Sequence, residues 1–536
     1  MENMFLFTLN DLEGNFGYLM TDSHASHPLR LLLVILSGRP LIQSSRTSLL
    51  QSKRKEKIRV GGVSDQSTTE KFEHRQVPES FIFAIEKIVQ ETVATLDTTS
   101  LHSLATHPIG NPFLQLLLTI ELAPSTASKA RADHPLLDKL LSIETVAEAP
   151  REPVDDVEDS TKSAFLTGML YDPIGSRLVE TIVTHAPGKV FKGLYRGFFK
   201  EKIRQHARNE TASYVVMRLL ERLSKEDLQQ AVDAILPEIP SLVERSRTAI
   251  IKTMVERCAV RKAPTEALAE AIESGYSEDG SFQLRRLLRF EHPEDHLVKG
   301  RNDDTSKEDM SQLHGSLLAQ ALLAVPGRPS ELIYNSLLEL PVDTLVSMAE
   351  RPTASHVLQA SSKLPTSSVA FRRKLIFRLF GRIALLAVNT SGSHMIDALW
   401  PATHGLIHYR ERIAQELLTH EAEIRGSFVG KAVWRNWMMD LYSRRRTDWI
   451  VKAKASEPGA PVPKTEQPLV NRGDQEDDRS SYKTNGTKSG IELAREKFAT
   501  SRARAGAGRR GGGSSVLSRG TGANMVSKVS RVDSTR

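Results

Sequence analysis

Apolar residues recur along most of the chain at a spacing that places them on one face of an α-helix. Between residues 191 and 203 they fall at 191, 194, 195, 198 and 199. Between residues 371 and 386 they fall at 371, 375, 376, 379, 380, 383 and 386. Both patterns follow the 3.6-residue period of an amphipathic helix. Because sustained alternation with a period of two residues is absent, we expect an all-α fold.

A short motif recurs ahead of the Leu-rich runs and consists of a small residue, a short polar residue and a bulky residue. Its stronger copies are Ala25-Ser26-His27, Gly110-Asn111-Pro112, Gly175-Ser176-Arg177, Ala212-Ser213-Tyr214, Gly315-Ser316-Leu317, Ala354-Ser355-His356 and Gly392-Ser393-His394. Weaker copies are Arg247-Thr248-Ala249, Gly280-Ser281-Phe282 and Gly430-Lys431-Ala432. From residue 176 onward, successive copies lie about 36 residues apart, which predicts stacked units of two or three helices.

A second polar residue follows the first by four positions and therefore lies one turn further along the same helical face. The pairs are Ser26/Arg30, Asn111/Gln115, Ser176/Glu180, Ser316/Gln320, Ser355/Gln359 and Ser393/Asp397. This pattern resembles the Pumilio (PUF) RNA-binding repeat. In that family the first and last residues of a five-residue stretch bind a base edge, the second residue stacks between bases, and each repeat takes one base. With ten copies, two insertions and a basic tail, the chain is similar to the nucleolar Pumilio-like branch.

The resemblance implies a set of RNA-binding residues. Base-edge contacts would come from Asn111, Gln115, Ser176, Glu180, Ser316, Gln320, Ser355, Gln359 and Ser393, and stacking from His27, Arg177, Tyr214, His356 and His394. In the family, Ser with Glu suits guanine, Ser with Gln suits adenine, and Asn with Gln suits uracil. Degenerate repeats would contact phosphates or only maintain the solenoid, and the implied backbone contacts are Arg30, Lys252, Arg285, Lys431 and Arg435.

The resemblance also implies a fold, a location and partners. It implies a monomeric right-handed α-solenoid of about ten repeats, curved into a C or U shape, in the nucleus and nucleolus. The expected partners are single-stranded pre-rRNA around the 3′ end of the 18S sequence with its adjoining spacer, and proteins of the small-subunit preribosome. It further implies a basic leader and one more repeat before residue 1, or else a different N-terminal cap. A cytoplasmic PUF translational repressor and a HEAT- or armadillo-type protein scaffold remain as alternatives, although a scaffold needs no Ser/Gln pairs.

Charge and composition divide the chain into four regions. We expect an N-terminal repeat at 1–43, a basic insertion loop at 44–77, a repeat solenoid at 78–452 with an acidic insertion near 123–163, and a disordered Arg/Gly/Ser-rich tail at 453–536. Residues 455–536 contain 15 Lys and Arg against 9 Asp and Glu, whereas the whole chain carries +7, so the remainder is close to neutral. The tail is therefore a separate cationic segment, suited to sequence-independent RNA contact.

Two internal basic clusters allow more than one interpretation. Lys53 to Lys57, inside the first insertion, is typical of a solvated loop, an RNA contact or a nuclear import signal. Arg372, Arg373, Lys374, Arg378 and Arg382 lie opposite an apolar stripe, and form either a solvated outer face or a surface for RNA or protein.

Several classes of function are excluded by the residues present. The single cysteine, Cys258, rules out an internal disulfide framework and a multi-cysteine metal site, and indicates a reducing compartment. No apolar run approaches the roughly 20 residues of a membrane helix. The G-x-G-x-x-G at residues 506–511 follows no strand and is not a dinucleotide site. We therefore expect no enzyme activity, no metal and no cofactor.

Overall fold

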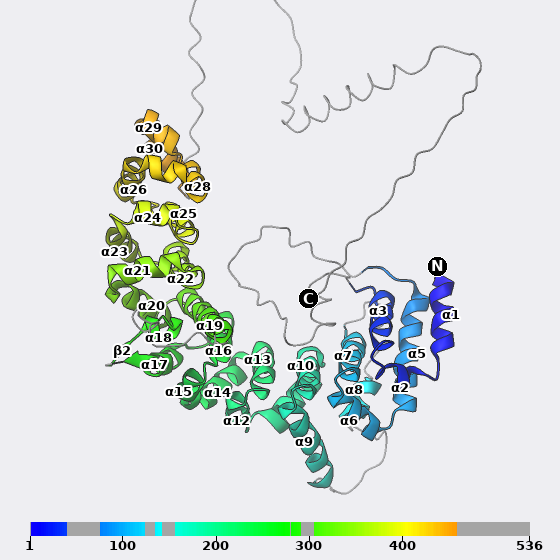
Figure 1. Ribbon diagram of the computed structural model, residues 1–536. Coiled ribbons are helices and arrows are strands. Elements are labelled where there is room, and N and C mark those ends of the chain that lie inside the picture. Colours follow the sequence, from blue (N-terminus) through cyan, green and yellow to red (C-terminus); the bar gives the residue numbers. More distant parts are fainter. Residues whose placement is uncertain are drawn as a thin grey trace, which may run out of the picture. The chain divides into compact units, whose positions relative to one another are not determined.

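The computed structural model describes residues 2–39, 75–123, 134–141, 156–278, 280–290 and 305–457, without the side chains of 156–163 and 305–308 (Figure 1). Almost all of the predicted basic insertion, most of the acidic insertion and the tail after residue 457 lie outside these residues. Within the described part of the chain, no helix is long and apolar enough to cross a bilayer.

The described chain is built of helices, as the periodicity predicted. A row of long helices carries the recurring motif and is called here the inner row: α3 (Ser26–Leu36), α7 (Gly110–Glu121), α10 (Gly175–His185), α13 (Ala212–Arg222), α16 (Thr248–Arg261), α19 (Thr305–Ala324), α22 (Pro352–Lys363), α25 (Gly392–Ala402) and α28 (Phe428–Asn436). Each member packs directly against the next in chain order, so the motif marks one layer of a stacked-repeat solenoid (Figure 1).

The remaining elements connect and cover the inner row. They are α1 (Glu2–Leu12), α2 (Phe16–Leu19), α5 (Glu79–Thr95), α6 (Thr98–Thr106), α8 (Pro135–Leu140), α9 (Asp156–Tyr171), α11 (Gly188–Leu194), η2 (Tyr195–Phe199), α12 (Ile203–Arg208), α14 (Lys225–Ile235), η3 (Leu236–Glu238), α15 (Ile239–Glu244), α17 (Glu266–Gly275), α18 (Leu284–Leu288), α20 (Arg328–Glu339), α21 (Val342–Glu350), α23 (Val369–Leu379), α24 (Ile383–Val388), α26 (Ile407–Thr419), α27 (Glu421–Gly426), α29 (Met439–Arg444) and α30 (Arg446–Ala455). A two-stranded antiparallel hairpin joins β1 (Ser277–Glu278) to β2 (Ser281–Phe282).

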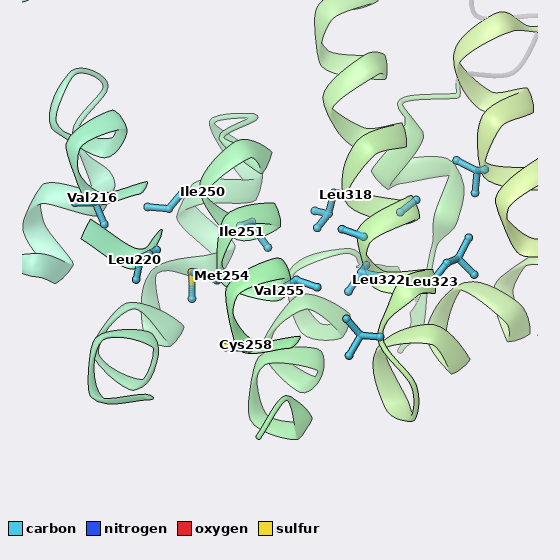
Figure 2. Packing of buried hydrophobic residues seen from close by; sticks show 14 of the residues in the cluster. Val216, Leu220, Ile250, Ile251, Met254, Val255, Cys258, Leu318, Leu322 and Leu323 are labelled. Atoms are coloured by element: carbon cyan, nitrogen blue, oxygen red, sulfur yellow. The ribbon is translucent and has the colours of Figure 1, made fainter. Parts of the chain in front are cut away.

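Branched and sulfur-containing side chains hold neighbouring inner helices together. Figure 2 shows this between α13, α16 and α19, where Val216, Ile251, Met254, Leu318 and similar residues point into the spaces between the helices. These four side chains are completely buried. Burying a side chain of this size contributes about 1.5–3 kcal/mol, so each repeat gains its stability from the interfaces on both sides.

The small residue of the motif is a packing requirement. At Gly392 an added Cβ would lie 2.7 Å from the carbonyl oxygen of Leu386, at the end of the preceding helix α24. The equivalent approach is even closer at Gly315 and Gly430, where the obstacle is again a backbone carbonyl. The glycine therefore allows the inner helix to pass directly against the backbone of the helix before it.

One weak copy of the motif does not form a repeat. Residues 280–282 belong to the β1–β2 hairpin, where Gly280 takes a φ of +80° at the turn. The inner row passes directly from α16 to α19. Arg285 therefore lies on the short helix α18 and not on an inner helix, and its contact with the RNA backbone stays a prediction. The described residues contain nine inner helices where the sequence suggested ten copies.

Arginines at the ends of inner helices bind the carbonyls of the neighbouring inner helix. Arg222 of α13 donates to the carbonyls of Val183 (2.5 Å) and Ala186 (2.7 Å) at the end of α10. Arg257 of α16 donates in the same way to the carbonyl of Glu221 at 2.9 Å. The last carbonyls of a helix lack intrahelical donors and carry partial negative charge, so these contacts stabilise both the helix ends and the repeat stack.

The solenoid continues slightly further than the predicted boundary at 452. Helix α30 runs to Ala455, and Ala453 is fully buried. The buried Arg410 donates to the carbonyl of Ala453 at 2.8 Å and to the hydroxyl of Thr403 at 2.8 Å. Because a buried guanidinium must have its donors satisfied, α30 is an integral part of the last repeats.

Candidate nucleic-acid interface

The first polar residue of the stronger motif copies is buried in the inner row. Asn111, Ser176, Ser316, Ser355 and Ser393 are between 0% and 4% exposed. Several of them hydrogen-bond within the protein: Ser316 donates to the carbonyl of Thr353 at 2.6 Å, and Ser393 to the carbonyl of Thr390 at 2.9 Å. As placed here, these residues offer little surface to an RNA base and act mainly within the repeat stack.

In three copies of the motif, the last polar residue is half-buried and is held by the first. Gln359 donates through Nε2 to the Ser355 hydroxyl at 2.8 Å, and Gln320 donates to the Ser316 hydroxyl at 3.2 Å. Gln115 donates in the same way to the side-chain oxygen of Asn111. A side chain fixed in this manner loses less conformational entropy when it meets a ligand. The buried serine therefore orients the glutamine, whose amide can present a donor and an acceptor to a base edge.

Glu180 occupies the same position on α10 but has a charged neighbour. Its carboxylate lies 3.7 Å from the Nε of Arg218, which comes from the next inner helix, α13. Arg218 also contacts Glu221 at 2.9 Å within its own helix. The Glu180 side chain is 24% exposed, so an incoming base with two donors, such as guanine, can reach it.

The residues expected to stack form two neighbouring pairs. Arg177 of α10 and Tyr214 of α13 come from adjacent inner helices, and so do His356 of α22 and His394 of α25. Tyr214 is 49% exposed and His394 is also exposed, whereas Arg177 and His356 are half-buried. Between the two pairs, α16 and α19 carry Ala249 and the buried Leu317 at the equivalent position, where no flat side chain is available.

Burial also sets the charge of one stacking residue. The pKa of His356 is lowered by desolvation, and the positive charges of His394 and Lys363 lower it further. Its imidazole is therefore neutral at pH 7, which favours stacking through the ring over attraction to phosphate.

The cations expected to contact the RNA backbone are placed unequally. Lys431 and Arg435 on α28 are exposed and form no ion pair with any described residue. Lys252 is ion-paired with Glu256 at 2.7 Å. Arg30 is only 5% exposed and donates to the ring of its neighbour His27 at 3.0 Å, so it positions His27 and presents little charge to a phosphate.

Two features of this surface were not found from the sequence. One is the internal role of the serines, which for Ser316 depends on a carbonyl of the following repeat. The other is the capping role of Arg222 and Arg257, whose partners lie about one repeat away in sequence. In the described residues, no group of three or more His, Cys, Asp or Glu side chains is arranged to hold a metal ion.

The repeats are similar in sequence and in fold to those of known proteins. The profile of the NOP9-like PUF repeat domain matches residues 1–432. Nucleolar protein 9 of Paracoccidioides brasiliensis is 45% identical over 502 residues, covering 93% of this chain and 70% of that protein. Nucleolar protein 9 of Leptosphaeria maculans is 45% identical over 509 residues, covering 94% and 68%. The structure of APUM23 with GGAAUUGACGG superposes with a TM-score of 0.64 at 16% identity, covering 85% of this chain and 79% of that one. The prediction of an all-α solenoid of PUF-like repeats is thereby confirmed.

Proposed function

This chain belongs to the NOP9-like PUF repeat family and is a nucleolar protein, and from that premise we propose that it binds single-stranded pre-rRNA as a ribosome assembly factor. The proposed site is the exposed face of the inner row. The observation that carries the proposal is the set of half-buried Gln side chains, fixed by buried Ser or Asn partners, together with the half-buried Glu180 and two stacking pairs.

Single-stranded RNA suits this face better than duplex RNA. Stacking between Arg177 and Tyr214, or between His356 and His394, requires an unpaired base. An A-form duplex has a deep, narrow major groove that keeps most base edges out of reach. Nine inner helices can take on the order of nine nucleotides if each repeat accommodates one base.

Selectivity is expected to be partial. Gln320, Gln359 and Glu180 are placed to bind base edges, whereas α16 and α28 carry Lys252 and Arg435 at the equivalent position. Repeats of the second kind contribute phosphate contacts, which add affinity without reading sequence. Such a mixture suits a protein that occupies one abundant RNA.

The RNA that we propose is the precursor around the 3′ end of the 18S sequence and its adjoining spacer. Bound there, the protein acts by occupancy and not by chemistry of its own. A segment held across the inner row is inaccessible to an endonuclease, so the protein delays the final cleavage until it leaves. Proteins of the small-subunit preribosome are the further partners in this proposal.

The experiment measures binding and protection together. A spacer-containing RNA is incubated with the full chain and then with the processing endonuclease. We expect cleavage to slow in proportion to occupancy, tighter binding to the single strand than to a duplex of the same sequence, and lower affinity at higher salt. Equal affinity for duplex and single strand would contradict the proposed site, and full-rate cleavage of saturated RNA would contradict the protective role.

A further inference from the structure

A second basic surface lies outside the inner row, on the helix formed by α11 and η2. Lys189, Lys192, Arg196 and Lys200 follow one another at intervals of three, four and four residues, so they lie on one face of this helix. All four are exposed. We call them the α11 stripe, which extends over about 16 Å at a rise of 1.5 Å per residue.

The stripe faces away from the inner row. The opposite face of the same helix is formed by Phe191, Tyr195 and Phe199, which are buried. The ring of Phe191 lies 4.4 Å below the guanidinium of Arg222, and Tyr195 donates to the carbonyl of Asp227 on α14 at 3.3 Å. Because these aromatic residues attach the helix to the core, the cations on its other face point toward solvent.

The four cations are free of protein partners in the described chain. None of them forms an ion pair or a side-chain hydrogen bond, and Glu201 is the single acidic residue between 188 and 208. The neighbouring Arg204 and Arg208 differ, because both bind Glu238, at 2.6 and 3.1 Å.

The arginine-rich helix α23 provides a contrast. There Arg378 donates to the carbonyl of Leu338 at 2.6 Å and Arg372 to the carbonyl of Ala402 at 2.9 Å. Arg382, just after this helix, donates to Asp343 at 3.2 Å. Those arginines serve the solenoid itself. The α11 stripe has no such structural use, although the folded part of the chain is close to neutral overall.

Two glycines leave the backbone accessible beside the stripe. A Cβ added at Gly193 or Gly197 would meet nothing within 4 Å, so packing does not require glycine at either position. Glycine within a helix costs roughly 1 kcal/mol relative to alanine. Gly197 also lies in the π-turn η2, where the Lys200 amide donates to the carbonyl of Tyr195 at 2.8 Å. The helix is therefore weakened locally on the face that carries the free cations.

We propose that the α11 stripe binds the phosphate backbone of RNA that extends beyond the inner row. The spacing of the cations, about one helical turn or 5–6 Å, suits successive phosphates of one strand. The exposed face of the helix presents ammonium, guanidinium and glycine backbone but no exposed apolar side chain. It therefore lacks the desolvated aromatic or aliphatic anchor that protein interfaces use. The contact reads no bases, and it goes beyond the site proposed above by giving the same RNA a second point of attachment.

The test uses the full chain with two RNAs. One is a single strand of about ten nucleotides, which the inner row alone accommodates. The other carries the same sequence with unstructured flanks to a total of about 40 nucleotides. The stripe variant is Lys189→Gln, Lys192→Gln, Arg196→Gln and Lys200→Gln. The control variant makes the same change in net charge at exposed cations outside the inner helices, which also lack ion pairs in the described chain: Lys225→Gln, Arg245→Gln, Lys262→Gln and Lys452→Gln.

We expect the stripe variant to bind the short RNA like the parent and the long RNA roughly ten- to hundred-fold more weakly at low salt. The slope of log affinity against log salt for the long RNA should fall by up to about 3, because each phosphate contact to a single strand contributes about 0.7. The control variant should change both RNAs little. Since all eight side chains are exposed, melting temperatures should stay at the parent value.

Three results overturn the proposal. Equal losses in the stripe and control variants would show an effect of net charge alone. Equal losses on the short and long RNAs would place the stripe within the primary site. Unchanged binding of both RNAs would show that RNA does not occupy the stripe, and would leave an acidic protein segment as its partner. The proposed function is tested separately by the affinity of the parent for the short RNA. If the parent does not bind this RNA, the proposed function fails whatever the stripe variant does.

Discussion

The sharpest test of the inner row is the double variant Arg177→Ala, Glu180→Ala on α10. The two side chains are half-buried on the surface of the row, one turn apart. Ser176 is left in place, because it is only 2% exposed and a change there would perturb the packing between repeats. The variant therefore removes one stacking surface and one base-edge contact without opening a cavity.

The loss in affinity can be estimated from the contacts. A stacked base contributes about 1–3 kcal/mol, and a hydrogen bond to a charged group about 1.5–3 kcal/mol. The gain from the hydrogen bond is smaller than this value, because Glu180 must give up its contact with Arg218 when it binds a base. An exposed ion pair of this kind contributes about 0–1 kcal/mol. The expected net loss of about 1.5–6 kcal/mol corresponds to binding that is weaker by at least roughly ten-fold. Stability should change by less than about 0.5 kcal/mol, because Arg218 keeps Glu221 as a partner at 2.9 Å.

The assay is fluorescence anisotropy with a ten-nucleotide RNA, in which each position is replaced by adenine in turn. The parent should lose affinity at the position that Glu180 reads as guanine, and the double variant should be insensitive there. The matched control is Arg245→Ala, Glu244→Ala, which removes the same residue types from exposed positions at the end of α15, outside the inner row. Parent-like affinity of the double variant, with an unchanged melting temperature, would refute the assignment of this repeat.

The remaining predictions concern stability and the tail. Burial lowers the pKa of His206 to about 4, so acidification from pH 6.5 toward pH 4 should cost about 3 kcal/mol of stability, because the unfolded chain takes up the proton first. The free energy of unfolding in urea should fall less steeply with decreasing pH for His206→Gln than for the parent. Parallel curves for the two proteins would show that His206 is not the source of the pH dependence. Gly392→Ala should destabilise by about 1–3 kcal/mol through its clash with Leu386, whereas Gly193→Ala, in open space, should stabilise slightly; equal effects in urea unfolding would disprove the packing argument. Deleting 458–536 should reduce affinity for all RNAs alike, measured by competition with unrelated RNA, and a change in base selectivity would show that the tail reads sequence.

The sequence alone determined the type of fold and the position of most inner helices. The reason is that a repeat must bury its apolar face against its neighbours, so Leu, Val and Ile recur at helical spacing in every unit. The small residue of the motif recurs for a similar reason, since the inner helix passes close to a backbone carbonyl at Gly315, Gly392 and Gly430. Packing requirements that recur in every repeat therefore appear directly as a periodic pattern of residues in the sequence.

The sequence misled where a short motif occurs without its context. Gly280-Ser281-Phe282 matches the pattern, but no helix of sufficient length surrounds it, and the segment forms a hairpin. The boundary at 452 also fell too early, because the burial of Ala453 depends on Arg410, more than 40 residues away.

Tertiary structure decided which residues of the motif are available to a ligand. Ser355 and Gln359 are equally polar in sequence, yet the serine is buried against the next repeat and the glutamine remains half-exposed. Tertiary contacts also decide which cations are available to a ligand. Arg378 and Arg196 are both arginines on amphipathic helices, but carbonyls of α20 bind Arg378, whereas no described group binds Arg196. Helical periodicity specifies the face on which a side chain lies, whereas the atoms that satisfy it come from other repeats and are known only once the chain has stacked.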